Sequence, residues 1–412
     1  MRILIMTDSP NIPTGQGRVG REIAMGLQRH GHQIGYIGWF QHPDAPTIPP
    51  PGIRLWPTNN SHYGSDILDR VVNSFQPDVL LTISDFWNIW YITDPNVCRT
   101  RRYFQWCSYI PVDGEPIGGG IPPGIRNIIA DVDIPIAYTD YAKNAVLKSI
   151  FDQETRNRIR TIYHGVDTSV FKPLPREERE RLRAHYGLQD KFVFLTVSRN
   201  QSRKNIPELF RAWKQFAELP ETRGRVVLWP HMVFNDPMGW RIDDLMDVLK
   251  LRNTNSIMYF EEVAHSYSEL VLIPDKKLAE LYQLADAFIL IAGEGFGLPT
   301  FEAMASRLPC ILLDSAASSE LGADGRAELV PSAGAITWTG GQLTQRPLPS
   351  VDAVVASMEK VWRNRQYRQS IAEKGYEFAT KHTWQAVTDQ WAAMFLEHEV
   401  PFLKPKMMEV VA

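Results

Sequence analysis

The 412-residue sequence has few cysteines, no long hydrophobic run and no excess of charge of either sign. Its three cysteines, Cys98, Cys107 and Cys310, are too few and too far apart for a disulfide framework, and none is spaced with histidine as in a zinc site. No apolar segment approaches the ~20 residues that cross a bilayer. The short apolar run at residues 3–6 ends at Asp8, which is typical of a first strand and not of a signal peptide. We therefore expect a cytoplasmic protein in a reducing compartment, without a transmembrane segment.

The 44 basic and 47 acidic residues nearly cancel, with a formal net charge of −3. A protein that binds nucleic acid or an anionic membrane through its overall charge needs a basic excess, so the charge balance does not point to either partner. A hydrophobic content of 44% is that of an ordinary globular protein. At roughly 150 residues per domain, the length predicts two domains.

What the sequence does contain is a glycine-rich turn directly after an apolar run at residues 286–291. Gly293, Gly295 and Gly297 leave this turn without side-chain bulk, so a ligand can approach the backbone. Pro299 then stands where a first helical residue would be, ahead of a segment of helix formers. The pattern predicts a buried parallel strand, a glycine loop and a helix N-terminus whose free backbone N–H groups attract an anion.

Two carboxylates frame the same turn, Glu294 in the loop and Glu302 one turn into the predicted helix. Because negative charge beside an anion site weakens that site, each carboxylate needs a task other than holding phosphate. Glu302 is partly explained as an acid near a helix start, where it interacts favourably with the helix dipole. Glu294 has no such explanation and is a candidate functional residue.

The spacing of Glu294 and Glu302 across G-F-G-L-P-x-x-E-A-M-A resembles the signature of retaining glycosyltransferases of family 4. Members of that family have the GT-B architecture, an α/β fold in which two Rossmann-like, doubly wound domains face each other across a cleft. The resemblance implies an N-terminal acceptor-binding domain at residues 1–168 and a nucleotide-sugar-binding domain at 169–380. Residues 381–412 would form a C-terminal helix that crosses back to the first domain.

The N-terminus offers a competing interpretation, because Gly15, Gly17 and Gly20 match G-x-G-x-x-G between a predicted strand at residues 2–7 and a helix at 18–30. A dinucleotide-binding oxidoreductase needs these glycines directly after the strand and an acid at the end of the second strand. Here a loop intervenes, and the second strand ends in aromatic residues. In the resembled family a glycine-rich turn at this place lies over the donor diphosphate, which implies that Gly15 and Gly17 contact the donor.

A second strand-to-helix turn carries three cations after a strand predicted at residues 192–197. Arg199, Arg203 and Lys204 lie where an α/β fold binds phosphate. The resembled family places an Arg and a Lys of this turn on the donor pyrophosphate, and Arg199 and Lys204 match them, whereas Arg203 is predicted to face solvent. The R-N-Q-S-R-K-N form, with R-V-G-R-E near the N-terminus, is also similar to viral and phage-type members of the family.

Acidic residues in the first domain have two different interpretations. Asp113 lies in a glycine- and proline-rich loop after a strand predicted at residues 102–109, where many family members carry a histidine that implies an acceptor role. Asp131 and Asp133 match the D-x-D pattern of metal-dependent transferases. Because they stand between a predicted helix and the next strand, we interpret them as structural and expect no metal.

A cluster of aromatic residues, Phe86, Trp87, Trp90 and Tyr91, follows a strand predicted at residues 79–84. Burial in a core is the commoner role of such residues. The carboxyl end of a strand is also where an acceptor pocket would lie in this class of fold. The sequence leaves both interpretations open.

The resemblance implies a site with groups from both domains. The catalytic candidates are Glu294, Arg199, Lys204 and Asp113. The donor-binding candidates are Gly15, Gly17, Gly295, Phe296, Gly297, Leu298 and Glu302. As the glycosidic bond breaks, negative charge grows on the distal phosphate, so the cations and the helix N-terminus would stabilise it. Glu294 would contact the donor sugar, and Glu302 the nucleotide ribose.

The implied activity is transfer of a hexose from a nucleotide-diphosphate sugar to an acceptor hydroxyl, with retained anomeric configuration and no cofactor besides this co-substrate. A UDP-sugar is favoured and a GDP-sugar comes next. The acceptor stays open among a glycan, a lipid-linked sugar, a protein and a modified nucleobase. The alternatives are a sugar phosphorylase of the same fold, a NAD-dependent oxidoreductase and a non-catalytic nucleotide-sugar-binding protein.

Overall fold

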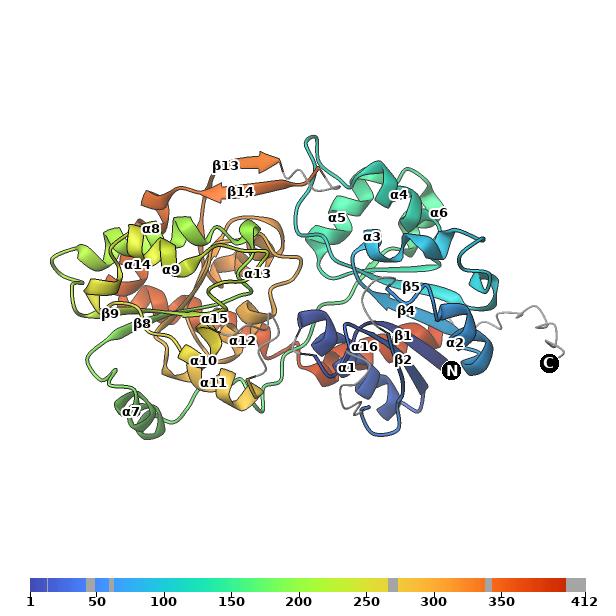
Figure 1. Ribbon diagram of the computed structural model, residues 1–412, viewed down its shortest axis with the longest axis horizontal. Helices are drawn as coiled ribbons and strands as arrows, with labels where there is room; N and C mark the ends of the chain where they lie inside the picture. Colours follow the sequence, from blue (N-terminus) through green and yellow to red (C-terminus); the bar gives the residue numbers. More distant parts are fainter. Residues whose placement is uncertain (13, 42–48, 59–62, 266–272, 338–342, 398–412) are drawn as a thin grey trace. The chain divides into compact units, whose positions relative to one another are not determined.

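The computed structural model describes all residues except 13, 42–48, 59–62, 266–272, 338–342 and 398–412, and the chain divides into two compact units (Figure 1). Unit 1 comprises residues 1–165 and 384–412, and unit 2 comprises residues 166–383. The sequence placed these boundaries after residues 168 and 380. The last part of the predicted C-terminal segment, residues 398–412, lies outside the described residues.

Unit 1 is built on a parallel seven-stranded sheet in the order β3-β2-β1-β4-β5-β6-β7. The strands are β1 (Arg2–Asp8), β2 (Gln33–Trp39), β3 (Arg54–Pro57), β4 (Val79–Ile83), β5 (Gln105–Ile110), β6 (Ile134–Ala137) and β7 (Arg160–Thr161). The helices are α1 (Gly15–Arg29), α2 (Leu68–Phe75), α3 (Phe86–Ile89), α4 (Pro123–Ala130), α5 (Asp140–Ser149), α6 (Gln153–Arg158) and α16 (Trp384–Glu397). The strand order reverses between β1 and β4, which is the switch point where a Rossmann sheet binds ligands.

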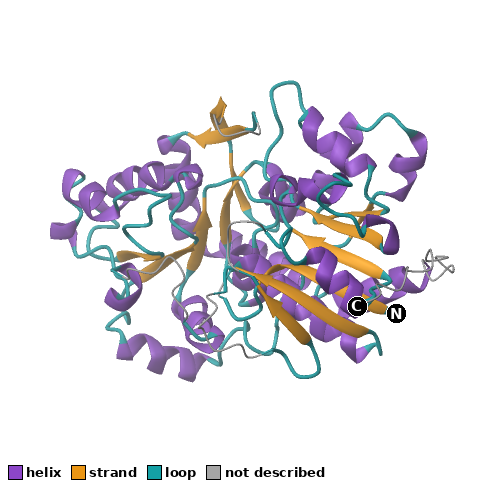
Figure 2. Cartoon of the chain, turned by 45° about the vertical axis from the view of Figure 1, so that its right-hand side comes forward, coloured by secondary structure: helices purple, strands orange, loops and turns teal. Residues whose placement is uncertain are grey.

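Burial on both faces explains why the central strands of unit 1 read as continuous apolar runs. Strand β1 pairs with β2 on one side and β4 on the other, and Ile3, Leu4 and Ile5 are fully buried. Figure 2 shows helices on both faces of the strands. Helix α16 returns from the end of the chain to pack against α1, where Gly26 lies directly beneath Thr388.

Helix α1 begins at Gly15, earlier than the predicted start at residue 18. Thr14 is the N-cap, and its hydroxyl accepts a hydrogen bond from the Gly17 N–H at 3.0 Å while donating to Asp8 Oδ2 at 2.5 Å. The prediction that Gly15 and Gly17 form a turn before the helix is therefore wrong, because both residues lie in the first turn of α1. The capping hydroxyl of Thr14 allows the helix to begin there despite the glycines.

Unit 2 contains a parallel five-stranded sheet in the order β12-β11-β10-β8-β9 and a separate antiparallel hairpin, β13-β14. The strands are β8 (Phe192–Val197), β9 (Val226–His231), β10 (Ala287–Leu290), β11 (Cys310–Leu313), β12 (Glu328–Val330), β13 (Ser332–Thr337) and β14 (Gln345–Pro349). The helices are α7 (Arg176–His185), α8 (Ile206–Glu218), α9 (Ile242–Val248), α10 (Glu261–Ala264), α11 (Asp275–Leu284), α12 (Leu298–Ala305), α13 (Ala316–Gly322), α14 (Val351–Arg363) and α15 (Arg365–Ala379).

The five strands of unit 2 follow the 2-1-3-4-5 order of a flavodoxin-like doubly wound sheet, with β8 as the first strand. Their order reverses between β8 and β10, so the switch point lies between these two strands. The predicted α/β class with two Rossmann-like domains is confirmed. Across the described part of the chain, no helix combines the length and the apolar character that crossing a membrane requires.

Candidate active site

The two strands that flank the switch point of unit 2 carry three of the four predicted catalytic groups in the loops at their carboxyl ends. Lys204 follows β8, Glu294 follows β10, and the Lys204 ammonium forms an ion pair with Glu294 Oε1. The pair is largely withdrawn from solvent, with side-chain exposures of 7% for Lys204 and 13% for Glu294. The structure thus brings together two candidates that lie far apart in the sequence.

Arg203 joins the same cluster, so its predicted solvent-facing position is wrong. Its Nη1 donates to the Gly293 carbonyl at 3.2 Å and lies 4.0 Å from Glu294 Oε2. The reason is local geometry: a 3₁₀ turn at Ser202–Lys204 ends at Asn205, whose left-handed backbone (φ 51°) starts helix α8. This turn directs two successive cations toward the glycine loop.

Asn205 also ties the β8 loop to its surroundings. Its side-chain Nδ2 donates to the Ile291 carbonyl at 2.9 Å and to the Pro347 carbonyl at 3.0 Å. Ile291 directly follows β10 and precedes the glycine loop. The loop after β8 and the loop after β10 are therefore held in register by a buried side-chain amide, which the local sequence pattern did not indicate.

Arg199 is oriented by a separate carboxylate that the sequence interpretation missed. Its Nε donates to Asp236 Oδ2 at 2.8 Å, and its Nη2 lies 3.4 Å from Asp236 Oδ1. The Asp236 side chain is only 1% exposed, whereas that of Arg199 is 39% exposed. Asp236 follows β9, the strand next to β8, and this position at the carboxyl end of the sheet was the signal that could have identified it.

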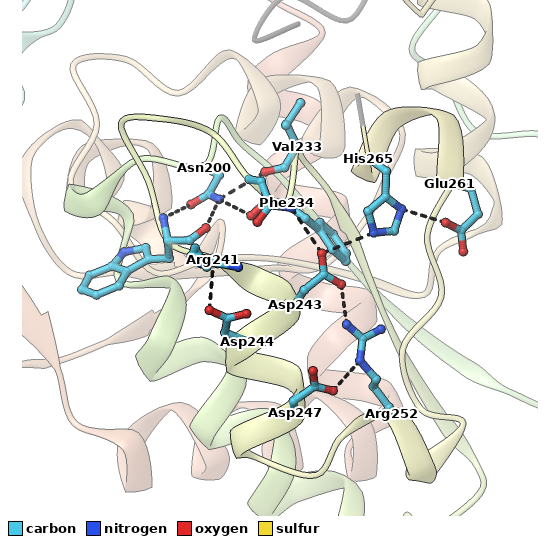
Figure 3. Close-up of polar contacts among 12 residues, drawn as sticks. Asn200, Val233, Phe234, Arg241, Asp243, Asp244, Asp247, Arg252, Glu261 and His265 are labelled. Carbon is cyan, nitrogen blue, oxygen red and sulfur yellow. Dashed lines mark hydrogen bonds and ion pairs between the residues drawn. The ribbon is translucent and has the colours of Figure 1, made fainter. Parts of the chain in front are cut away.

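Asn200 fixes the segment that follows β9, and its contacts with Val233 and Phe234 are drawn in Figure 3. Its fully buried Nδ2 donates to the carbonyls of Val233 at 3.2 Å, Phe234 at 3.2 Å and Trp240 at 2.6 Å. Its Oδ1 accepts from the Trp240 N–H at 2.9 Å. One amide thus satisfies four backbone contacts and holds the loop after β9 against the β8 turn.

A network of charged groups lies beside the loop that follows β9 (Figure 3). Arg252 donates to Asp243 at 2.5 Å and to Asp247 at 2.5 Å, and His265 lies 3.3 Å from Asp243 and 2.8 Å from Glu261. Burial opposes ionisation of Asp243, but the hydrogen bonds from Arg252 and His265 prevail and lower its pKa. The network links α9 to α10, so we assign it a supporting role and no contact with a ligand.

Helix α12 begins as the glycine turn predicts. Gly297, with φ of 96°, is its N-cap in a conformation that favours glycine, and Leu298 is the first helical residue. Glu302 is 4% exposed and accepts a hydrogen bond from the Tyr282 hydroxyl at 2.7 Å. Phe296 is 4% exposed and packs edge-on against the Phe301 ring.

Candidates in unit 1 form a separate set. Gly15 and Gly17 lie at the start of α1, and Asp113 is half-buried in the loop after β5. At the end of β1, burial raises the pKa of Asp8 to about 6, against the opposing hydrogen bond from Thr14. These candidates belong to unit 1, whereas Lys204, Arg203 and Glu294 belong to unit 2.

The D-x-D residues pair with an arginine, as their structural interpretation expects. Asp133 Oδ2 accepts from the Trp106 N–H at 2.7 Å and from Arg101 Nη2 at 3.0 Å. Asp131 Oδ2 lies 3.9 Å from Arg101 Nε. Within the described ranges, no group of three or more His, Cys, Asp and Glu side chains is arranged to hold a metal ion.

Comparison with known proteins gives one family match and several similar chains. Residues 255–339 match the model of a domain described as Glycosyl transferases group 1. The chain is 26% identical over 270 residues to a GDP-mannose-dependent alpha-(1-6)-phosphatidylinositol monomannoside mannosyltransferase of Mycolicibacterium smegmatis. That alignment covers 62% of this chain and 65% of the mannosyltransferase, so the chain spans less than two thirds of this curated relative.

Two solved structures share the fold over nearly the whole chain. Sucrose-phosphate synthase from Thermosynechococcus elongatus has a TM-score of 0.74 at 16% identity, covering 97% of this chain and 99% of that one. Anabaena Alr3699/HepE, in complex with UDP and glucose, has a TM-score of 0.70 at 16% identity, covering 96% and 100%.

The matched domain contains the turn from Glu294 to Glu302 on which the resemblance was based. The relationship to viral and phage-type members stays a prediction, because it depends only on the two short arginine-containing motifs. The domain match, the curated relative and the shared architecture agree with one another. The chain therefore has the GT-B fold and carries a Glycosyl transferases group 1 domain, which makes it similar to glycosyltransferases of the family 4 type.

Proposed function

We propose that this protein transfers a hexose from a nucleoside-diphosphate sugar to an acceptor hydroxyl, with retention of anomeric configuration and without a metal ion. The matched glycosyltransferase domain and the similar mannosyltransferase support the general activity, glycosyl transfer from a nucleotide sugar. The observation that carries the proposal is the buried pair of Lys204 and Glu294 at the switch point of unit 2. The pair supports the proposal because an ammonium suits phosphate, a carboxylate suits sugar hydroxyls, and both lie close in sequence or space to the N-terminus of α12.

The diphosphate is the part of the donor that unit 2 is best suited to hold. Lys204 supplies a compact positive charge, and Arg199 a guanidinium whose direction Asp236 fixes. The first N–H groups of α12 add a partial positive charge. Because Lys204 is already paired with Glu294, a bound phosphate has to share or replace that ion pair.

The mechanism follows from how few carboxylates are available to the sugar. A double-displacement reaction uses two carboxyl groups about 5 Å apart, one as nucleophile and one as acid and base. Here Glu302 is buried in α12 and accepts a hydrogen bond from Tyr282, so Glu294 alone is assigned to the sugar. We assign Glu302 to the edge of the nucleotide ribose. We infer that the acceptor attacks from the face of the departing phosphate, which takes the acceptor proton.

The base of the donor nucleotide and the acceptor are narrower questions. A UDP-sugar is the favoured donor, and a GDP-sugar is the next. The solved relative from Anabaena holds UDP and glucose, and the mycobacterial relative is named for GDP-mannose. The acceptor is a glycan, a lipid-linked sugar, a protein or a modified nucleobase.

The test is thermal stabilisation of the full chain by UDP, GDP, ADP, NAD and inorganic phosphate. We expect one nucleoside diphosphate to raise the melting temperature by mass action. NAD alone would support the oxidoreductase, and stabilisation by phosphate in the presence of a free sugar would support the phosphorylase. Stabilisation without turnover of any sugar nucleotide would support a non-catalytic binding protein.

Variants of Lys204 and Glu294 test whether the nucleotide binds at this site. Lys204→Ala removes the nearer of two cations beside the buried Glu294, while Arg203 stays at 4.0 Å, and the loss of a buried ion partner destabilises a protein by about 3–5 kcal/mol. The informative variant is therefore Lys204→Ala combined with Glu294→Gln, compared with Glu294→Gln alone. Lys214→Ala, which removes a lysine paired with Glu218 on α8, is the matched control. Nucleotide binding that persists in the double variant would contradict the site.

A further inference from the structure

Two tryptophans in unit 1 are exposed although their neighbours are buried. Trp87 is 45% exposed and Trp90 is 51% exposed, whereas Phe86 is 2% and Tyr91 is 5% exposed. The aromatic cluster that the sequence left open is therefore half core and half surface. Burial is normal for tryptophan, so two exposed indoles in one short segment indicate a contact surface.

The two indoles lie on consecutive helical turns that follow β4. Trp87 belongs to α3, and Trp90 begins a 3₁₀ turn at Trp90–Thr93. Residues three apart in a helical segment are neighbours on its surface. The pair thus forms one aromatic surface, supported from beneath by Phe86 and Ile89 in the core.

This surface lies at the edge of the sheet where ligands of a doubly wound domain bind. Strand β4 borders the switch point of unit 1, and β5 is its next neighbour. The loop after β5 carries the half-buried Asp113 and Ile117, which is 72% exposed. Helix α4, which follows that loop, contacts α3. Aromatic, apolar and acidic groups therefore come from two adjacent strand ends.

Two carboxylates and one buried hydroxyl lie among the polar groups at this edge. Asp85 precedes the aromatic surface, and Asp8 ends the adjacent strand β1. Tyr138, one residue beyond β6, has a buried hydroxyl with no hydrogen-bond partner among the described residues. Burial, followed by the charges of Asp85 and Asp8, raises the pKa of Tyr138.

We propose that Trp87 and Trp90 are a stacking surface for a pyranose ring of the acceptor, whose hydroxyls are bound by Asp85 and Asp113. The acceptor is then a glycan. This inference rests on the proposed function, because only a transferase needs an acceptor at the strand ends of unit 1.

A pyranose matches this combination of groups better than the other acceptor classes do. One face of the ring is a sheet of C–H bonds that packs on an aromatic plane, while its rim carries hydroxyls that donate to carboxylates. A lipid surface with anionic headgroups and a nucleic acid both bring negative charge, which Asp85 and Asp113 would repel.

The experiment is binding of the full chain, without donor, to a glycan microarray that displays mono- to hexasaccharides. Wild type should bind a defined group of glycans. Trp87→Ala and Trp90→Ala should each bind them about two- to tenfold more weakly, and the double variant more weakly still. Trp87→Phe should retain most of the binding, since a ring remains. Phe151→Ala is the matched control, because Phe151 is an 81% exposed aromatic residue of unit 1 outside this edge.

Two companion measurements separate the outcomes. Stabilisation by UDP or GDP should be equal in wild type and both tryptophan variants. If no nucleotide stabilises wild type, the proposed function fails, whatever the array shows. Absence of tryptophan-dependent glycan binding would overturn the inference while the proposed function stands. Sedimentation with vesicles of phosphatidylcholine and phosphatidylserine that is lost in the tryptophan variants would also overturn it, in favour of a membrane contact.

Discussion

The ion pair between Lys204 and Glu294 serves two parts of the proposed donor at once. In the absence of donor each group neutralises the other, which allows both to be largely buried. In the proposed mechanism, a bound diphosphate gives Lys204 a second anionic partner and leaves Glu294 available to the sugar. The pair is thus a means of keeping two charged groups in place until a ligand with complementary charge arrives.

Glu294→Gln tests this account at the level of a single side chain. Removing the competing carboxylate should tighten binding of the nucleoside diphosphate by about 1 kcal/mol, roughly fivefold, in calorimetric titration. The same change should lower sugar turnover about 100-fold, because the carboxylate contact with the sugar is lost. Weaker binding of the diphosphate by Glu294→Gln would show that Glu294 does not compete with phosphate.

Asp8 gives a pH-dependent prediction. Burial raises its pKa from 3.8 to about 6, against the hydrogen bond from Thr14. Between these two pH values the unfolded chain has released the proton and the folded chain still binds it, so the free energy of unfolding falls as pH rises. The Asp8 contribution to this fall is about 3 kcal/mol.

Urea unfolding of Asp8→Asn at pH 4, 5, 6 and 7 measures that contribution. Asparagine keeps an oxygen that accepts from Thr14, so the variant should be more stable than wild type at pH 7 and should lose part of the advantage at pH 4. An equal difference in stability at all four pH values would contradict the raised pKa.

At the scale of elements, the close approach between α1 and the loop after β1 explains Gly17. A Cβ at this position would lie 2.7 Å from the Ser9 carbonyl oxygen and 3.0 Å from that of Ile12, and both are backbone atoms. Gly124, in the first turn of α4, would meet nothing within 4 Å. The two glycines occupy similar places in their helices but differ in what surrounds them.

Alanine at each position should therefore have opposite effects. Gly17→Ala should lower the free energy of unfolding by about 1–3 kcal/mol through overpacking. Gly124→Ala should raise it by about 0.5–1 kcal/mol through helix propensity and reduced freedom of the unfolded chain. Denaturant melts of both variants check this, and stabilisation by Gly17→Ala would refute the close packing of this turn.

The elements themselves show how far the sequence predicts the site. The strand predicted at residues 192–197 is β8 with the same bounds, because its apolar run is buried on both faces. The glycine turn before α12 was also readable, since Gly297 and Pro299 act locally. The roles of Asp236 and Tyr282 could not be predicted from the sequence. Their partners, Arg199 and Glu302, are distant in the sequence and come close only in the folded protein.

At the scale of the whole molecule, unit 1 is built from two separate parts of the chain, residues 1–165 and helix α16. Helix α16 supplies Trp391, which is fully buried and packs edge-on against Tyr109 with ring centroids 4.9 Å apart. A core in unit 1 therefore depends on residues from beyond unit 2 in the sequence. This part of the unit 1 core forms only after α16 has been synthesised.

Trp391→Ala should act on unit 1 alone. The loss of a fully buried indole costs about 3–5 kcal/mol. In scanning calorimetry we expect a transition that falls in temperature and a second transition, stabilised by the nucleoside diphosphate, that does not move. A decrease in the nucleotide-stabilised transition would instead place the cores of the two units in one cooperative unfolding reaction.

The central claim is that the switch point of unit 2 holds the donor diphosphate, and a crystal structure of the full chain with its best-binding nucleoside diphosphate tests it most directly. The account predicts phosphate oxygens within hydrogen-bonding distance of Lys204 Nζ and the Arg199 guanidinium, in front of the first N–H groups of α12. Phosphates bound at the start of α1, beside Gly15 and Gly17, with the Lys204–Glu294 pair unchanged, would contradict it.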